Sequence, residues 1–370
     1  MFPLADYAAP MDMPAATVPR KGRGAQTNDS GRFEPLRREA FDDGWGTGED
    51  VPAPLATTLS VDATRTIIAR NDSPDIGFDR SINPYRGCEH GCIYCYARPS
   101  HAYLGLSPGL DFETRIFYKP QAAALLASEL GKKGYSCRPL ALGSNTDPYQ
   151  PAERKLGITR AILDVLRDFR HPVTIVTKSA LVQRDLDILG EMAAQGLAIV
   201  TVSLTTLDRA LARRMEPRAA TPQRRLETIA ALAAGGVPVG VLAAPMIPAL
   251  NDSELEAILE AARDAGAGLA GYTMLRLPLE LKALFKEWLQ AHFPDKAQHV
   301  LSLVAQSHGG RLYDSAWGTR MRGSGPYAEM IGARFDRACR RLGLAARMPF
   351  SLDNSRFRPP PQKGDQLSLL

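Results

Sequence analysis

Short runs of apolar residues alternate with longer segments of helical periodicity between about residues 80 and 290. Five of these runs are nearly continuous in aliphatic residues, which is typical of strands that are buried on both faces. The runs are 138–144, 171–179, 197–204, 237–245 and 270–278. Repeated strand–helix units with crossovers predict a parallel sheet, and the helices between the strands favour a barrel or partial barrel.

Two of the intervening helices carry start and stop signals. Thr221 is placed to cap a helix that has Pro222 in its first turn and that ends at Gly235. Asn251 and Glu254 resemble a capping box that opens a second helix. The residues predicted to face the core are Leu226, Ile229, Ala230 and Ala233 in the first helix, and Leu255, Ile258, Leu259 and Ala262 in the second.

The ends of the chain differ from this alternating middle part. Residues 1–60 are dense in proline and glycine, so most of this arm is expected to be poorly ordered. The sequence predicts a core domain over 61–290, a helical C-terminal extension over 291–350 and a linker-like, flexible tail over 351–370.

Composition narrows the setting of the protein. The 370 residues contain no run of 18 or more uninterrupted apolar residues, which argues against a membrane span, and the first residues do not resemble a secretory signal. Five cysteines in a chain of this size do not make a disulfide framework, so a cytoplasmic location is predicted. Cys137 and Cys339 are interpreted as ordinary buried residues.

The other three cysteines are grouped. Cys88, Cys92 and Cys95 fall within eight positions, in a segment without the regular apolar spacing of a core element. A structural zinc site needs four ligands, for which His90 or His101 would have to supply the fourth. A [4Fe-4S] cluster has four irons, so three thiolates leave one iron open to another ligand. Both interpretations remain at this point, and the ligand count favours the cluster.

The Cys-x3-Cys-x2-Cys spacing, with an aromatic residue before the last cysteine, resembles the radical S-adenosylmethionine (SAM) superfamily. The segment NPYRGCEHGCIYCYAR is similar to the branch that contains spore photoproduct lyase, and the resemblance runs from about Ser81 to Ile247. It implies a partial (β/α)6 TIM-type barrel with a [4Fe-4S] cluster and SAM as cofactors. In that superfamily the open iron binds SAM, and one electron releases a 5′-deoxyadenosyl radical that takes a hydrogen from the substrate. The resemblance also implies lyase- or oxidoreductase-like chemistry and a flavodoxin- or ferredoxin-like electron donor.

Residue roles follow from the same resemblance. Cys88, Cys92 and Cys95 are expected to ligate the cluster, and Tyr94 is expected to lie against the adenine of SAM. The rest of the SAM site is expected where the predicted strands end. The residues at these positions are Ser144, Asn145, Thr146 and Asp147 after the run 138–144, Lys178 after 171–179, Ser203 and Thr205 near 204, and Ile247 just after 245.

Each of these positions has an expected contact and an ordinary alternative. Lys178 is expected to meet a carboxylate as a point charge, or else to be a solvated lysine. Ser203 and Thr205 are expected to hydrogen-bond the ribose, and the backbone around Ile247 to flank the adenine. Glu216, with Arg218, is a candidate for polar contacts to SAM or substrate, or else for a surface ion pair. The polar residues from 144 to 147 are also common in turns.

One position departs from the pattern of the branch. Spore photoproduct lyase has a cysteine just before its Thr-Asp pair, which returns a hydrogen to the product radical, and this chain has Asn145 there. The photoproduct reaction itself is therefore not implied. Tyr149, Tyr103 and His101 are alternative relays, although ordinary packing explains each of them better.

Substrate signals lie late in the chain. Tyr313, Trp317 and Tyr327 stand among many arginines, a mixture that suits phosphates and bases, although arginine-rich helices more often present only a solvated face. The final pentapeptide, Gln366 to Leu370, resembles the short sequence by which bacterial repair proteins bind the sliding clamp; its alternative is to fold back on the protein.

Three classes of function are compatible with these signals. The first is a radical SAM enzyme that acts on damaged DNA or another nucleic acid. The second is the same kind of enzyme with a protein or small-molecule substrate. The third is a non-catalytic protein with a structural zinc ion. About four irons per chain, against one zinc, separates the third class from the others.

Overall fold

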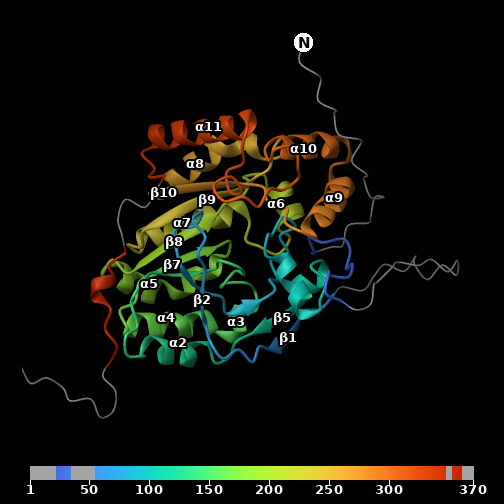
Figure 1. The fold of residues 1–370 in the computed structure, drawn as a ribbon. Helices are drawn as coiled ribbons and strands as arrows, with labels where there is room; N and C mark the ends of the chain where they lie inside the picture. Colours follow the sequence, from blue (N-terminus) through green and yellow to red (C-terminus); the bar gives the residue numbers. More distant parts are fainter. Residues whose placement is uncertain (1–21, 35–54, 347–351, 361–370) are drawn as a thin grey trace, which may run out of the picture.

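The computed structural model describes residues 22–34, 55–346 and 352–360 (Figure 1). Its centre is a seven-stranded sheet with the order β10-β9-β8-β7-β6-β3-β2. The strands are β2 (Ile68–Arg70), β3 (Arg80–Ile82), β6 (Leu140–Leu142), β7 (Val173–Thr177), β8 (Ala198–Ser203), β9 (Val239–Met246) and β10 (Leu269–Met274). From β3 to β10 all neighbouring strands are parallel, whereas β2 pairs with β3 in the antiparallel direction.

Helices follow the parallel strands and form the outer layer of the fold (Figure 1). These helices are α2 (Ala122–Leu130), α4 (Ile158–Asp168), α5 (Leu186–Ala193), α7 (Pro222–Ala234), α8 (Leu255–Asp264) and α11 (Pro326–Leu342). α11 contacts α8 and β10, so it lies in this layer although it falls in the predicted C-terminal extension. Among the described residues the edge strands β2 and β10 do not pair with each other. The predicted α/β class is confirmed, and the arrangement is that of a partial barrel.

Shorter elements surround the barrel. A three-stranded sheet has the order β1-β5-β4. The remaining elements are β1 (Thr58–Val61), β4 (Tyr85–Arg86), η1 (Arg98–Leu104), α1 (Leu110–Thr114), β5 (Arg115–Tyr118), α3 (Glu153–Leu156), η2 (Ala180–Asp185), α6 (Arg209–Met215), η3 (Asp252–Glu254), α9 (Leu281–His292), α10 (Pro294–Gln306) and η4 (Asn354–Arg356).

The predicted helix signals are confirmed in part. The Thr221 hydroxyl accepts a hydrogen bond from the backbone N–H of Arg224 at the start of α7, whose C-cap is Gly235. In α8 all four residues predicted to face the core are buried. Ala230 in α7 is exposed, contrary to the prediction, because the buried face of this helix runs through Thr228, Ile229 and Leu232.

The predicted capping box at residues 251–254 is wrong. The Asn251 side chain makes no cap hydrogen bond to its own helix. The Glu254 carboxylate accepts hydrogen bonds from the Thr206 hydroxyl and from the backbone N–H of Leu207. Both side chains hydrogen-bond other loops instead of capping their own helix. This is possible because the chain after β8 lies close to them.

Within the arm that was expected to be mostly poorly ordered, residues 22–34 pack on the body of the protein, with Ala25 fully buried. Residues 58–60 of the same arm belong to β1. The rest of the arm, 1–21 and 35–54, lies outside the described residues, as does the tail pentapeptide Gln366 to Leu370.

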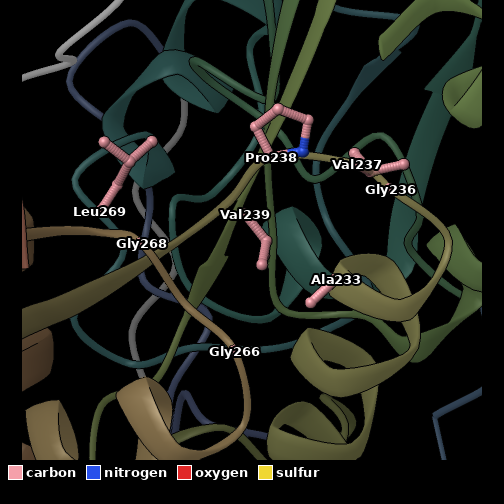
Figure 2. A pocket seen from close by; sticks show the side chains of 8 residues that line it. All are labelled: Ala233, Gly236, Val237, Pro238, Val239, Gly266, Gly268 and Leu269. Atoms are coloured by element: carbon pink, nitrogen blue, oxygen red, sulfur yellow. The ribbon is translucent and has the colours of Figure 1, made fainter. Parts of the chain in front are cut away.

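An apolar pocket of about 370 Å³ opens where β9 and β10 begin (Figure 2). It is lined by Ala233, Gly236, Val237, Pro238, Val239, Gly266, Gly268 and Leu269. It lies at the amino ends of these strands and carries no titratable side chain, so it is separate from the predicted site. No helix in the described part of the chain is both long and apolar enough to cross a membrane.

Candidate functional site

The three grouped cysteines lie in a tightly turned loop after β4. Backbone hydrogen bonds join Gly91 N to Cys88 O at 3.4 Å and Cys95 N to Cys92 O at 3.2 Å. Gly87 and Gly91 adopt φ values of +78° and +68°, where other residues are strained. Cys88 and Cys92 are buried, and Cys95 is half-buried and packs against the apolar cluster of each. The fold therefore gathers the three thiols at one place.

This donor set suits a cluster better than a single zinc ion. Among the described residues, no group of three or more His, Cys, Asp and Glu side chains is arranged to hold one metal ion. The imidazoles proposed as a fourth ligand have other partners: His90 Nδ1 lies 3.3 Å from the Asp147 carboxylate, and His101 Nε2 lies 3.0 Å from the Arg115 carbonyl oxygen. A cluster takes one thiolate per iron, so its ligands do not have to converge on one point.

Burial raises the pKa of the Cys88 and Cys92 thiols above the usual range. In addition to burial, the Asp147 carboxylate raises the pKa of Cys88, whereas the Lys178 ammonium opposes the rise at Cys92. Metal ligation requires thiolates, so binding has to displace these protons.

Asp147 connects the ends of β6 and β7 to the cysteine loop. Besides its contact with His90, its carboxylate accepts hydrogen bonds from the Thr177 hydroxyl at 2.7 Å and from the backbone N–H of Lys178 at 2.8 Å. Burial acts to raise the pKa of Asp147, but His90 and these donors lower it to about 2. Asp147 is thus ionised and links the cysteine loop to the end of β7.

Asn83, at the end of β3, was not identified from the sequence. Its side-chain oxygen accepts the backbone N–H of Asn145 at 2.9 Å, and its amide nitrogen lies 3.1 Å from the Ser144 hydroxyl. The Thr146 hydroxyl donates to the carbonyl oxygen of Tyr85 at 3.1 Å. The predicted residues 144–146 are therefore held against the segment that leads into the cysteine loop. The polar residue directly after the apolar end of β3 was the available signal.

Glu216 is the centre of a buried polar group beside the loop. Its carboxylate accepts hydrogen bonds from the Tyr94 and Thr205 hydroxyls and pairs with Arg225. Its exposed fraction is 3%, so the surface ion pair that the sequence left open is wrong for Glu216. The Arg225 guanidinium also donates to the Ser203 carbonyl oxygen at 3.1 Å. Tyr94, Ser203, Thr205 and Glu216, predicted from separate motifs, are brought together here.

The remaining predicted residues border this group. The Lys178 ammonium lies 5.7 Å from the centre of the Tyr94 ring. Asn251 accepts the backbone N–H of Ile247 at 2.7 Å and donates to the Thr205 carbonyl oxygen at 2.7 Å. Arg218 instead pairs with Glu89 at 3.2 Å. Arg225 and Asn251 were missed as site residues because their sequence positions read as helix interior and helix cap.

An aromatic–cation pair lies next to the last cysteine. The Tyr96 ring is 46% exposed, and its hydroxyl donates to the carbonyl oxygen of Ser144. The Arg276 guanidinium lies over the ring, 4.9 Å from its centre. Neither residue was singled out from the sequence.

The other predicted relay and substrate residues are more dispersed. Tyr149 and His101 are fully buried, whereas Tyr103 is 71% exposed and its ring lies tilted against that of Phe33. On α11 the arginines at 337, 340 and 341 are exposed opposite the buried Ile331 and Phe335, which is the arrangement of a solvated face.

Residues 82–262 match the model of the Radical SAM superfamily. The matched segment covers just under half of the chain. The predicted recognition is therefore confirmed, and the predicted cofactors, a [4Fe-4S] cluster and SAM, are those of the superfamily. The residues of the site fit this pair of cofactors, because three grouped thiols adjoin a buried polar group at the strand ends.

Two relatives are themselves uncharacterised proteins. An uncharacterised protein of Mycobacterium tuberculosis (strain H37Rv) is 40% identical over 222 residues, which is 59% of this chain and 65% of that protein. The chain thus matches just under two thirds of that relative's length. An uncharacterised protein of Methanocaldococcus jannaschii is 25% identical over 60% of this chain and 80% of its own length.

The fold itself is shared with spore photoproduct lyase. A mutant of that enzyme superposes with a TM-score of 0.58 and 15% identity, covering 78% of this chain and 81% of the lyase. A second mutant, solved with bound AdoMet and dinucleoside spore photoproduct, gives a TM-score of 0.57 and 14% identity over 78% and 80% of the two chains. At such identity the likeness shows the fold.

Replacing Asn251 by alanine is expected to lower the free energy of unfolding by about 3 kcal/mol, because it leaves buried backbone groups of Ile247, Thr205 and Pro245 without their partner. Urea unfolding of the purified protein measures the change. Ser253→Ala is the matched control, since this neighbouring side chain is exposed. Equal midpoints for the two variants would show that Asn251 does not hold these loops.

Proposed function

We propose that this protein is a radical SAM enzyme that abstracts a hydrogen atom from a nucleic acid. The observation that carries the reaction class is the placing of three thiols beside the buried group of Tyr94, Thr205 and Glu216. Cys88, Cys92 and Cys95 would hold a [4Fe-4S] cluster, which would supply the electron for the reductive cleavage of bound SAM.

The residues of the chain bind and orient SAM in this proposal. Tyr94 offers its ring to the adenine while Glu216 fixes its hydroxyl, and the Lys178 ammonium attracts the carboxylate of SAM. Thr205 and Ser203 contribute polar groups for the ribose. The buried loops exclude water, which protects a reactive radical from side reactions.

The substrate class is proposed from the edge of the site. Tyr96 presents a half-exposed ring next to Cys95, with the Arg276 guanidinium over it. The segment after α10 also reaches the site, because Met274 N at the end of β10 donates to Met321 O at 2.9 Å. This segment carries Trp317, which is 59% exposed. Exposed aromatic rings with guanidinium groups suit the stacking of bases and the binding of phosphates.

Anaerobic reconstitution tests the reaction class. The loaded enzyme with SAM and dithionite is expected to yield equimolar methionine and 5′-deoxyadenosine, separated by chromatography. A fully loaded protein that binds no SAM and releases neither product would rule out the proposed activity.

The substrate class needs its own comparison. We expect more 5′-deoxyadenosine when ultraviolet-irradiated DNA is added than with intact DNA or no DNA. With DNA that carries deuterated thymidine, we expect deuterium to appear in the 5′-deoxyadenosine. Equal yields under all three conditions would leave a protein or small-molecule substrate, the second class considered above.

Two partners complete the proposal. A flavodoxin- or ferredoxin-like protein would supply the electron in place of dithionite. Contact with a sliding clamp through Gln366 to Leu370 stays a prediction, because this pentapeptide lies outside the described residues. Calorimetry with purified clamp at tens of micromolar, the range expected for a short apolar hook, tests it.

A further inference from the structure

Residues 22–34, which we call the N-terminal strap, lie directly on the cysteine loop (Figure 1, blue segment beside α9). At Gly24 an added Cβ would stand 1.8 Å from the Gly91 carbonyl oxygen and 3.2 Å from Ile93 N. Backbone therefore packs on backbone on either side of Cys92. A second such approach occurs where a Cβ at Gly109 would lie 2.3 Å from the Thr27 carbonyl oxygen. Both positions require glycine because nothing larger fits.

A buried ion pair links the strap to the loop. The Glu113 carboxylate is fully buried and accepts the backbone N–H groups of Gly24 at 3.0 Å and Ala25 at 2.8 Å. The same carboxylate pairs with Arg98, which is also fully buried. The guanidinium of Arg98 in turn donates to the carbonyl oxygens of Cys92 at 2.9 Å and Gly91 at 3.2 Å. The chain of contacts thus runs from the strap through Glu113 and Arg98 to a cysteine.

The strap is also anchored away from the loop. The Thr27 hydroxyl donates to Glu287 in α9 at 2.8 Å, and Leu110 N donates to the Thr27 carbonyl oxygen at 3.2 Å. Arg32 pairs with Glu280, just before α9. The strap therefore ties the cysteine loop to α9, an element about 190 residues further along the chain.

We propose that the N-terminal strap is part of the cluster site. The strap holds the backbone around Cys92 in position and excludes water and dioxygen from the cluster. The strap lies outside the segment that matches the superfamily, 82–262. The proposal rests on the assignment of the cluster to the three cysteines. Glu113 and Arg98 are positioning residues in it, since they act through the carbonyl groups of the loop and touch no thiol.

Two physical consequences follow. Removing a group that orients a metal ligand lowers metal affinity about 10–100-fold. Coupling is also reciprocal, so a strap that stabilises the loaded loop is itself stabilised by loading. The first consequence concerns variants and the second concerns the wild-type protein.

The decisive variant is Gly24→Ala, because a single methyl group forces the strap off Gly91. Gly77→Ala is the matched control, since a Cβ there meets nothing within 4 Å. After reconstitution we expect the Gly24 variant to lose its visible absorption in air about tenfold faster than wild type, with unchanged far-ultraviolet circular dichroism. The Gly77 variant is expected to decay at the wild-type rate. Equal decay of all three proteins would overturn the proposal.

Hydrogen exchange of the wild-type protein gives an independent reading. The amides of residues 24–28 are expected to exchange more slowly in the loaded than in the metal-free protein. Equal exchange would overturn the proposal even if the Gly24 variant failed to fold. A wild-type protein that takes up no iron would instead contradict the cluster assignment itself, so the two failures are distinguishable.

Discussion

Replacing any one of Cys88, Cys92 and Cys95 by alanine is expected to abolish the visible absorption of the reconstituted protein. Each thiolate holds a separate iron, and no other thiol stands in the loop to replace a missing ligand. The iron content should fall from about four per chain to a small fraction of that value. Absorption spectra and iron analysis of anaerobically reconstituted variants measure the effect.

The other two cysteines provide the controls. Cys339 is buried among apolar residues of α11, and Cys137 is half-buried in the segment before β6. Cys137→Ala and Cys339→Ala should therefore keep a full cluster. Full loading of Cys92→Ala, or binding of one zinc and no iron by the wild type, would contradict the cluster assignment.

The barrel could be predicted from the sequence because its strands are buried on both faces. In β8 five of the six residues are buried, so the pattern reads as a continuous apolar run rather than an alternating one. The cysteine spacing was equally informative, because its meaning depends on local separation along the chain. Each signal lies within a short stretch of sequence, so it can be read without knowing how distant parts of the chain fold.

The strap and the buried ion pairs could not be predicted for the opposite reason. Gly24 carries no side chain and no apolar periodicity, and its partner Glu113 is 89 residues away. Glu254 likewise has a sequence context that favours a local cap, yet its carboxylate binds the loop after β8. Polar side chains find partners across the fold, and single-sequence patterns record only those nearby.

Arg276 and Tyr96 illustrate the same limit at the edge of the site. They are 180 positions apart, and each alone reads as an ordinary surface or packing residue. The fold brings them together because β10 ends beside the cysteine loop. A substrate-facing pair of this kind becomes visible when the strand order is known.

Replacing Glu216 by glutamine is expected to lower the free energy of unfolding by about 3 kcal/mol. The substitution leaves the buried Arg225 guanidinium without its counter-charge, and breaking a buried ion pair costs more than losing a surface one. It also weakens the acceptor of the Tyr94 and Thr205 hydroxyls, so SAM affinity of the loaded protein should fall about tenfold, or 1.4 kcal/mol. Denaturant unfolding and equilibrium dialysis with labelled SAM measure the two effects.

A double-mutant cycle with Arg225→Met separates the ion pair from simple loss of packing. Arg225 alone also donates to the carbonyl oxygens of Ala220 and Ser203, so its single replacement should be costly as well. Removing both charges leaves no uncompensated ion, and the double variant should be more stable than the sum of the single losses predicts, by 1 kcal/mol or more. Strict additivity would mean that the two side chains do not act as a pair. SAM affinity should nevertheless stay low in the double variant, because Tyr94 then lacks the carboxylate that fixes its ring beside the cysteines. Recovery of SAM binding together with stability would show that Glu216 contributes only to the stability of the fold.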